Sequence, residues 1–431
     1  MGNSGLICFE NAYEITPATT GSYVDVDVSP FVPAGASGVL LEFSNYDQSA
    51  ARKFSARKKG STDDHYELLY NGIGGHNYFF CGLDSNRKLQ VKIETSNCKI
   101  WLIGYTDSKC AFFDNAYDFS NAQSAAWIDK NASTIVPADA VGVFGYFIPT
   151  TTIHAQAILR TKGSTEDTAG KNLVRGIIGV YTGINESKLF QYYTDTITCK
   201  LFIIGYSKAP IVWFTNPVKK GPLTLESTWQ EISCGSNVPS GANAVFVELV
   251  NFNGGAQQPH VTVRKKGSTD NRGIVDSRIR YTGHAYAVVG ISADGKFEAF
   301  FERDIDMAQD ISLVEFWLHG YAMWDGIHTV ALQHVNAPSV IYLGSTNRFQ
   351  ITVKDEDGNA IDADSFTITM KNPYKTSTDL SSTIVKASAG VYNLDYTFSA
   401  SNASGKWTLT VNTVKTGKTR INKLEITVER V

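Results

Sequence analysis

Apolar and polar residues alternate with a period of two along much of the chain. Residues 23–28 read YVDVDV and residues 88–95 read KLQVKIET, whereas 38–43 (GVLLEF) and 99–105 (KIWLIGY) are short apolar runs. A period of two places successive side chains on opposite faces of a strand, and short apolar runs are typical of strands covered on both sides. No segment sustains an apolar period of 3.6. The pattern therefore predicts an all-β protein of short antiparallel strands.

The same stretch of about 104 residues occurs three times. RKKGSTD at 57–63 returns as RTKGSTE at 160–166 and as RKKGSTD at 264–270, so that the central glycines lie 103 and 104 residues apart. VPAGASGVLLEF, CKIWLIGY and FENAYEIT each have counterparts at nearly the same spacing. A fixed period over several landmarks indicates a repeated structural unit. Seven or eight strands in such a unit suit an antiparallel β-sandwich or jelly roll.

The repeat divides the chain into four expected domains. We place β-sandwich repeats at residues 1–107, 108–208 and 209–325, and a different unit at 332–431. In that last unit, alternating strands surround an Asp-Gly-Asn turn, and GKWTLTV and KLEITVERV close the chain. This is the pattern of an immunoglobulin-like sandwich. The fold class we predict is all-β, with three tandem homologous sandwich or jelly-roll repeats followed by an immunoglobulin-like domain.

The last unit resembles a known family. VKDEDGNAID, GVYNLDYTFSA and GKWTLTV are similar to the small immunoglobulin-like modules of bacterial surface proteins and of bacteriophage tail and baseplate proteins. The resemblance covers about 100 residues. It implies a sandwich at the end of the chain, and it suggests a bacteriophage virion surface protein, either a capsid decoration or a tail or fibre component.

The repeated heptapeptide has two interpretations. As an anion cradle, its basic and hydroxyl side chains would hold a phosphate or sulfate, but the spacing and following helix of a Walker loop are missing. As a turn, it would end a strand, with its charges paired at the surface or facing a neighbouring repeat. We expect the turn. The candidate interface residues are Arg57, Lys59 and Asp63; Arg160, Lys162 and Glu166; and Arg264, Lys266 and Asp270.

A Gly-His motif raises a second possibility. GHNYFFCG at 75–82 aligns with GHAYAVVG at 283–290, whereas the second repeat has GIIGVYTG. A ligand pocket in the first and third repeats would use His76, Tyr78, His284 and Tyr286. Neither histidine has partners at the spacing that metal ligation or catalysis needs. A surface or hydrogen-bonding role is the simpler interpretation, and we expect no cofactor, no metal and no catalytic residues.

Cysteines and tryptophans give further expectations. The position of Cys98 and Cys199 holds Val314 in the third repeat, which indicates a small buried residue and reduced thiols. Trp101 and Trp317 occupy a repeated apolar strand, so we expect them in the core. Other tryptophans, at 127 and 229, remain candidates for stacking against sugar rings.

Composition limits the function classes. With 39 basic and 42 acidic residues the net charge is −3, which argues against nucleic-acid binding through phosphate neutralisation. No run approaches the roughly 18 apolar residues of a membrane span, and the first residues lack the pattern of a secretory signal. We therefore expect a protein that folds in a host cytoplasm and is located in the virion.

These observations predict a non-enzymatic structural protein of a phage particle, attached to the capsid or tail surface, with a further role in host adhesion. The expected partners are other virion proteins and a host surface glycan, with the chain present as a homo-oligomer or in many copies; nucleic acid and membranes are not expected. The alternative is a carbohydrate-binding multi-module protein of bacterial origin. A linear string of repeats and a pseudo-threefold arrangement both remain open.

Overall fold

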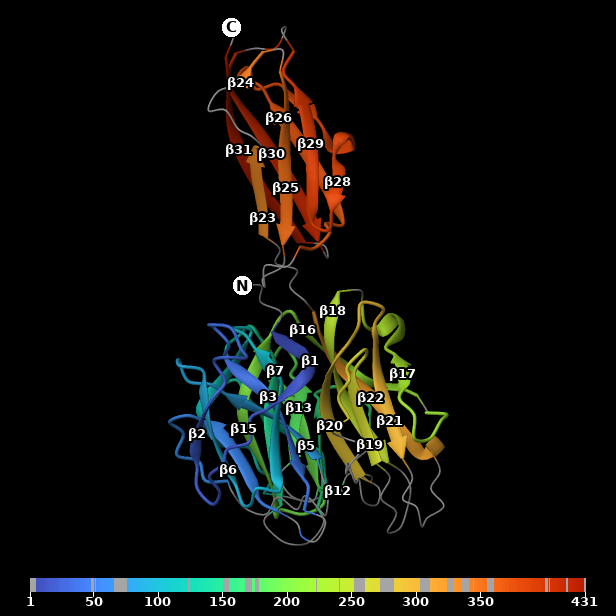
Figure 1. Cartoon of the computed structure of the whole chain (residues 1–431). Helices are drawn as coiled ribbons and strands as arrows, with labels where there is room; N and C mark the ends of the chain where they lie inside the picture. The colour runs from blue at the N-terminus through green and yellow to red at the C-terminus, as the bar shows by residue number, and fades with distance from the viewer. Residues whose placement is uncertain are drawn as a thin grey trace. The chain divides into compact units, whose positions relative to one another are not determined.

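The structure is a computed structural model of the 431-residue chain. It describes all residues except 1–4, 48–49, 51, 66–75, 123–124, 150–154, 167–172, 175–177, 222, 240, 252–259, 272–282, 303–310, 324–328, 335–340, 344, 355–359, 400–401, 403, 416–417 and 430–431. The described residues are strands and turns, apart from three short 3-10 helices (Figure 1). These are η1 (Gly235–Asn237), η3 (Ile311–Leu313) and η4 (Ser381–Thr383). The predicted all-β class is confirmed, and the sheets form four sandwich-like pairs.

The chain divides into two compact units, Ser4–Met323 and Trp324–Val431, the second together with Met1–Asn3. The larger unit contains three of the sheet pairs and the smaller unit contains the fourth.

The first sheet pair follows the residues of the first repeat. One sheet has the strand order β1-β7-β3-β5 and the other has the order β2-β6-β4. The strands of this pair are β1 (Leu6–Glu14), β2 (Val24–Asp27), β3 (Gly38–Asn45), β4 (Phe54–Lys58), β5 (His76–Gly82), β6 (Lys88–Ile93) and β7 (Cys98–Thr106). Successive strands thus alternate between the two sheets.

The second and third pairs repeat this order. Sheets β13-β10-β15-β8 and β11-β14-β9 form the second pair, and β16-β22-β18-β20 and β17-β21-β19 form the third. Their strands are β8 (Cys110–Asp118), β9 (Ile128–Asn131), β10 (Ala140–Pro149), β11 (Ala155–Thr161), β13 (Ile178–Gly183), β14 (Leu189–Thr194), β15 (Cys199–Lys208), β16 (Ile211–Lys220), β17 (Gln230–Ser233), β18 (Ala242–Asn251), β19 (His260–Lys265), β20 (Gly283–Gly290), β21 (Lys296–Glu302) and β22 (Val314–Met323). The short strand β12 (Leu173–Val174) joins β11 to β20 of the next repeat.

Alternating side chains fill each sandwich. In β7, Cys98, Ile100 and Leu102 are buried, and the residues between them face the other way. The equivalent residues of β15 and β22 are buried in the same manner. Burial of apolar surface on the inward faces, worth about 25 cal/mol per Å², is the main stabilising contribution to such a sandwich.

The smaller unit contains two sheets, β23-β25-β29-β28 and β24-β31-β30-β26-β27. Its strands are β23 (Thr329–His334), β24 (Ile341–Tyr342), β25 (Thr346–Lys354), β26 (Ser365–Lys371), β27 (Ser377–Asp379), β28 (Val385–Ser388), β29 (Val391–Thr397), β30 (Gly405–Lys415) and β31 (Lys418–Glu429). Phe349, Leu394, Phe398 and Trp407 lie in its core. The two sheets bury these side chains between them.

Candidate functional site at the contacts between repeats

The repeated heptapeptide is a turn at the end of one strand in each sandwich, β4, β11 or β19. Gly60, Gly163 and Gly267 have φ angles of +95°, +97° and +89°, and a Cβ added at any of them would have no atom within 4 Å. A positive φ explains the glycine. The turn that the sequence predicts is present in all three repeats.

The arginine of each turn holds the turn to its own sheet. The Arg57 guanidinium donates through Nε to Gln90 Oε1 at 2.9 Å and through Nη1 to the Asp63 carbonyl at 2.5 Å, and it lies 3.8 Å from the centre of the Tyr23 ring. Arg160 makes the same contacts with Gln191, the Glu166 carbonyl and Trp127. Arg264 does so with Glu298, the Asp270 carbonyl and Trp229. A guanidinium stacked on an aromatic ring is a stabilising arrangement.

The lysine of each turn pairs with an acidic residue on another strand of the same sheet. Lys59 pairs with Asp25, Lys162 with Asp129 at 2.7 Å, and Lys266 with Glu231 at 2.8 Å. The Lys59 ammonium lowers the pKa of the Asp25 carboxyl, and Lys162 does the same for Asp129. These pairs are partly exposed, so each contributes little to stability.

The serine and threonine of each turn contact the next repeat. The Ser61 hydroxyl and the Thr62 backbone N–H both donate to Asn115 Oδ1, at 3.0 and 2.8 Å. Ser164 and Thr165 donate to Asn216 Oδ1 in the same way, at 2.9 and 2.8 Å. The side-chain amide therefore takes the place that an anion would occupy in a phosphate loop.

The third turn completes a circle. Ser268 and Thr269 donate to Asn11 Oδ1 of the first repeat, at 3.0 and 2.9 Å. Asn11 lies in the part of β1 where the register with β7 shifts. Each repeat thus offers a turn to the following repeat and an asparagine to the preceding one. Three head-to-tail contacts of this kind close into a ring.

The acidic residue of the turn accepts a further hydrogen bond from the next repeat in two of the three contacts. The Ala116 N–H donates to Asp63 Oδ2 at 2.7 Å, and the Ala12 N–H donates to Asp270 Oδ2 at 2.8 Å. In the remaining contact the equivalent residue is Pro217, which has no N–H to donate. The acid there is Glu166 instead of Asp.

A side chain from each repeat inserts beside two positions of the preceding one, and these two positions form its cradle. They are Gly38 and Gly82 for Phe112, and Gly142 and Gly183 for Trp213. A Cβ at Gly38 would lie 2.2 Å from the Phe112 ring, and a Cβ at Gly142 would lie 2.1 Å from Trp213 Nε1. The equivalent of Gly38 and Gly142 in the third repeat is Ala244, and the inserted residue there is the smaller Cys8. The size of the inserted side chain therefore matches the space that the cradle leaves.

Equivalent strands of the three repeats meet at the centre of the ring. The strands β5, β13 and β20 contact one another, and Phe80, Tyr181 and Val288 belong to one shared apolar cluster. The Tyr181 hydroxyl lies 2.9 Å from the Val247 carbonyl and 2.8 Å from the Ala287 carbonyl, both of the third repeat.

The residues of the predicted ligand pocket lie on these central strands. Tyr286 is 3% exposed, and Tyr78 packs against the core of the third sandwich. The side chains of His76 and His284 lie outside the described residues. A Cβ at Gly179 would lie 2.1 Å from the Tyr78 carbonyl oxygen, so close approach of two backbones accounts for the glycine that replaces tyrosine in the second repeat.

The predicted burial of the position shared by Cys98 and Cys199 is confirmed. The prediction that Trp101 and Trp317 lie in the core is wrong in part. Cys98, Cys199 and Val314 are all buried, and all six cysteines are free. Burial raises the pKa of the Cys199 thiol to about 12. Trp101 and Trp317, in contrast, are half-buried on the opposite face of their strands, because the inward positions of β7 and β22 are those of Cys98 and Val314.

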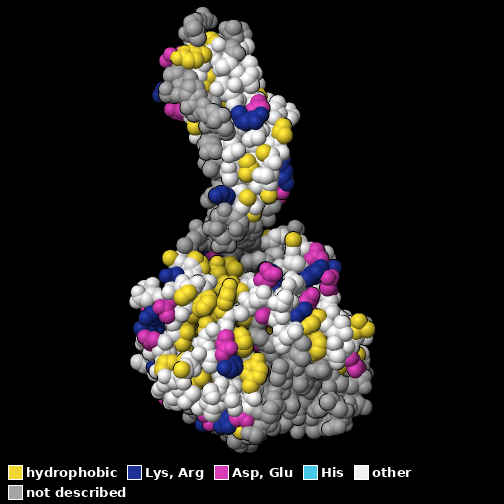
Figure 2. Space-filling model, in the orientation of Figure 1, with side chains coloured by type: hydrophobic (Ala, Val, Ile, Leu, Met, Phe, Trp, Pro, Cys, Tyr) yellow, Lys and Arg dark blue, Asp and Glu magenta, His cyan; other side chains and the backbone are white. Residues whose placement is uncertain are grey.

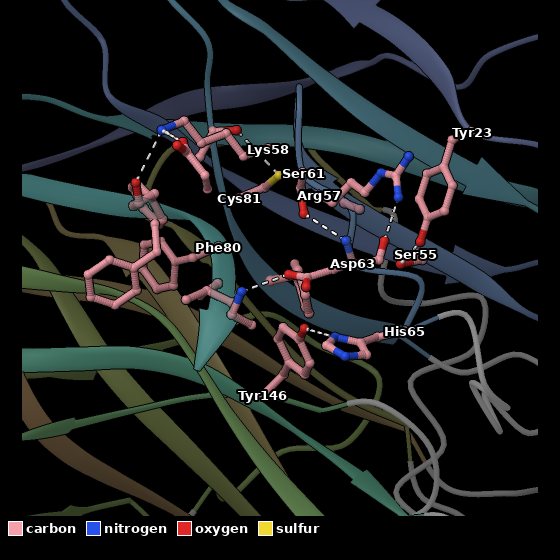
Figure 3. A pocket seen from close by; sticks show the side chains of 18 of the residues that line it. Tyr23, Ser55, Arg57, Lys58, Ser61, Asp63, His65, Phe80, Cys81 and Tyr146 are labelled. Atoms are coloured by element: carbon pink, nitrogen blue, oxygen red, sulfur yellow. Dashed lines mark hydrogen bonds and ion pairs between the residues drawn. The ribbon is translucent and has the colours of Figure 1, made fainter. Parts of the chain in front are cut away.

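A crevice lies between the first and second sandwiches, beside the first turn (Figure 3). It has a volume of about 30 Å³. Its lining includes Phe43, Phe79 and Tyr146, and the His65 ring is hydrogen-bonded to the Tyr146 hydroxyl. Burial raises the pKa of this phenol well above its usual value. A second cavity of about 30 Å³, beside Cys8 and Asp270, occupies the matching place between the third and first sandwiches.

Neither a metal-binding group nor a membrane-spanning helix is found among the described residues. They include no group of three or more His, Cys, Asp or Glu side chains arranged to hold a metal ion. Within the same part of the chain, no helix has the length and hydropathy to span a bilayer. Figure 2 shows basic and acidic side chains next to each other on the visible face of the larger unit, with hydrophobic side chains gathered beside them.

The asparagines of these contacts, and the role of three aromatic residues as platforms for arginine, were not identified from the sequence. Asn11, Asn115 and Asn216 recur in FENAYEIT, FDNAYDFS and FTNPVKKG, and the aromatic platforms Tyr23, Trp127 and Trp229 each precede the Val-Pro landmark by nine residues. Both sets keep the period of the turn. This common spacing is the signal in the sequence that could have linked the asparagines and the aromatic residues to the turn.

Comparisons with known proteins give little further information. No family model matches the chain, and no curated protein matches it. Among solved structures, an endo-β-1,4-mannanase from Thermotoga petrophila is 13% identical with a TM-score of 0.19; the match covers 24% of this chain and 20% of the mannanase. This chain thus spans about a fifth of that enzyme's length.

Two longer matches are equally remote. A DUF4785 family protein from Legionella pneumophila is 8% identical with a TM-score of 0.20, and the match covers 73% of this chain and 70% of that one. The D1–D4 ectodomain fragment of ICAM-5 is 12% identical with a TM-score of 0.21, with coverage of 71% and 78%. Likenesses with such low TM-scores carry no argument about fold or function.

Proposed function

We propose that this protein is a non-enzymatic structural component of a bacteriophage particle, attached to the capsid or tail surface. The observation that carries the proposal is the closed ring. Three turns bind three asparagines in a circle, so one chain presents three equivalent sandwiches around an axis. Particle surfaces are built from rotationally symmetric assemblies, and a body of this kind fits a threefold or local threefold position without first assembling from separate chains.

The finer fold that we infer agrees with this role. Strands that alternate between two sheets in the orders 1-7-3-5 and 2-6-4 are those expected of a jelly roll, an architecture common in viral capsid proteins. The three sandwiches are homologous repeats, as their matching residues suggest. The smaller unit is an immunoglobulin-like domain, in line with its resemblance to phage modules.

The repeated polar residues support a structural role over a catalytic one. The Arg57, Lys59 and Asp63 side chains bond to their own sandwich or to the next repeat. Their counterparts in the other repeats do the same, except for the Glu166 carboxylate. These contacts serve the ring and need no substrate to explain them.

The tryptophan platforms of the carbohydrate-binding alternative are also occupied. Trp127 lies under the Arg160 guanidinium and Trp229 under that of Arg264, each 3.8 Å from ring centre to Cζ. One face of each ring is therefore not available to a sugar. This weakens the expectation that tryptophans in every repeat bind glycan.

Mass spectrometry of purified virions tests the proposal, together with a reconstruction of the same particles. We expect the chain among the virion proteins, with density for a three-lobed body on the capsid or tail surface. A chain that is absent from particles and is instead secreted by a bacterium would contradict the proposal. Genes for capsid or tail proteins next to its own gene would support it.

A further inference from the structure

A fully exposed tyrosine lies at the tip of a hairpin in the smaller unit. Tyr374 is 79% exposed in the turn between β26 and β27, and no other large hydrophobic side chain of the described residues is as exposed. The turn is held by its own hydrogen bonds, because the Asn372 N–H donates to the Thr376 carbonyl and Asn372 Oδ1 accepts the Thr376 N–H, both at 2.9 Å. An aromatic ring on a fixed turn loses little entropy when a partner covers it.

Lysines surround this tyrosine. Lys371 and Lys375 flank it in the sequence, both are exposed, and neither forms a salt bridge with another described residue. Lys406 lies in β30, the strand that pairs with β26, and it is 79% exposed with Glu425 3.9 Å away. We call Tyr374 and these three lysines the tip. It fits a partner that offers both an aromatic surface and carboxylates.

The larger unit has two surfaces of that kind. Tyr13 in β1 and Tyr117 in β8 occupy the same position of the first and second repeats, and they are 45% and 46% exposed. Each packs against a phenylalanine, with ring centroids 5.2 and 4.9 Å apart. Acidic residues lie three positions before and one position after each tyrosine, namely Glu10 and Glu14, and Asp114 and Asp118. We call these groups the Tyr13 face and the Tyr117 face.

One carboxylate of each face is not paired with a cation of the chain. Glu14 and Asp114 form salt bridges with lysines. Glu10 and Asp118, both exposed, form none with a described residue, and Asp118 accepts only the Ser120 N–H, at 2.8 Å. Each face therefore keeps a negative charge that a lysine of another molecule can approach without displacing a partner.

The third repeat lacks this combination. Val218 stands in place of the tyrosine, and Thr215 and Lys219 stand in place of the two acids. The sandwich thus forms without an exposed tyrosine or acidic neighbours at these positions. Lys219 would moreover repel the lysines of the tip, so the matching charge is restricted to the first two repeats.

We propose that the tip of one copy of this chain docks on the Tyr13 face or the Tyr117 face of a second copy. Tyr374 would pack against the exposed tyrosine, and Lys371 and Lys375 would approach its acidic neighbours. The contact joins two different surfaces, so it does not close into a pair and can link many copies. This association goes beyond attachment to a particle and is a property of the chain itself.

Sedimentation equilibrium of the full chain measures the association. We expect the mean mass to rise with protein concentration up to about 1 mM. The association should weaken at least about threefold between about 50 and 500 mM salt, because the charges of the contact are exposed and are screened. A chain that stays monomeric over this range, whether its tip binds its own larger unit or a different kind of partner, overturns the proposal.

Charge reversal locates the contact. Lys371→Glu with Lys375→Glu should weaken the association at least about tenfold, and Glu10→Lys with Asp118→Lys should do the same. The chain with all four substitutions should associate again, because tip and faces have exchanged their charges. Thr215→Lys, at the matched position of the third repeat, should leave the association within about twofold. Undiminished association in either double variant, or no recovery in the fourfold variant, overturns the proposal.

A mixture of the two double variants decides the matter if the fourfold variant does not fold. One of them keeps the faces and the other keeps the tip, so they should associate with each other and not with themselves. Association of neither kind in the mixture would contradict a contact between tip and face. Circular dichroism melting curves show that the variants compared are folded.

Discussion

The contact between the second and third repeats and the contact between the third and first repeats follow one plan with different chemistry. In the former, the large Trp213 side chain fills a cradle of two glycines, and proline removes the backbone donor for the acid of the turn. In the latter, the small Cys8 faces Ala244, and Asp270 accepts the Ala12 N–H. Both keep the asparagine that accepts from Ser and Thr.

The difference shows that the hydrogen bonds from Ser and Thr to the asparagine set the geometry of each contact between repeats. The other stabilising interactions around these bonds vary from contact to contact. One contact relies more on apolar packing, and the other keeps an additional charge-assisted hydrogen bond. Such bonds contribute about 1.5–3 kcal/mol, which is comparable with the burial of part of an indole. Either arrangement closes the ring.

The largest difference between the two contacts should appear on truncation of the inserted side chain. Trp213→Ala should lower the free energy of unfolding of the Ser4–Met323 unit by about 3 kcal/mol, because a half-buried indole is lost. Cys8→Ala should cost only about 1 kcal/mol. Differential scanning calorimetry of the full chain measures both. Equal losses would show that the side chains do not carry the contacts as described.

The next largest effect on stability should come from changing the inserted side chain together with the cradle residue that it faces. Cys8→Phe alone should destabilise by about 1–3 kcal/mol, because the larger ring meets the Ala244 side chain. Adding Ala244→Gly copies the arrangement of Phe112 against Gly38 and should recover at least about 1 kcal/mol. A double-mutant cycle by urea unfolding gives the coupling, and Ala244→Gly alone is the control. Purely additive effects would contradict the match in size.

The acid of the turn should matter in one contact and not in the other. Asp270→Ala should cost about 1–2 kcal/mol, since it leaves the Ala12 N–H without its acceptor. Glu166→Ala should change stability by less than about 0.5 kcal/mol, because Pro217 offers no N–H to its carboxylate. Urea unfolding of the two variants side by side tests this. A large loss in Glu166→Ala would point to a partner for that carboxylate outside the contact described.

The smallest effect should be a difference in acid sensitivity. Hydrogen bonds from Lys266 and Lys296 lower the pKa of the Glu231 carboxyl, and Lys162 lowers that of Asp129. A carboxyl whose pKa is lower in the folded state stabilises the protein above its unfolded pKa of about 4, and this contribution is lost as the pH falls through the folded pKa.

Removing the lysine should therefore flatten the loss of stability below about pH 4. Lys266→Met should have a larger effect than Lys162→Met, because the Lys266 ammonium bonds two carboxylates, those of Glu231 and Asp294, and Lys162 bonds one. Melting temperatures between about pH 5 and pH 2 check the order of the two variants. The reverse order would contradict this account of the pairs.

Alternation and internal repetition predicted the strands and the turns, because both depend on local side-chain chemistry. Gly60 is followed by Ser and Thr in every repeat, and a positive φ is satisfied within the turn itself. The ring could not be predicted in the same way. Each repeat carries both an asparagine and a turn, so pairing within one repeat, as of Asn11 with Ser61, satisfies the same bonds on paper as pairing with a neighbour.

In the candidate site, too, features that depend on neighbouring residues were predicted and contacts between distant residues were not. Arg57, Lys59 and Asp63 were identified because they lie together in sequence, but their partners lie far from them along the chain, namely Tyr23, Gln90, Asp25 and Ala116. Trp127 and Trp229 were identified as aromatic and assigned to sugars, because nothing local reveals the guanidinium that covers them. Trp101 lies on the face of β7 opposite to Cys98 and Leu102, and the apolar pattern of one strand does not tell which of its two faces points into the core.

Ring closure within one chain also changes how such a protein varies over generations. In a trimer of identical chains, a single codon change alters all three interfaces at once, so a substitution that suits only one of them is lost. Here each interface is encoded separately. Trp213, Phe112 and Cys8 could diverge one at a time with their cradles, without weakening the other two contacts. Joining three copies in one reading frame frees one lobe to specialise while the other two preserve the shape.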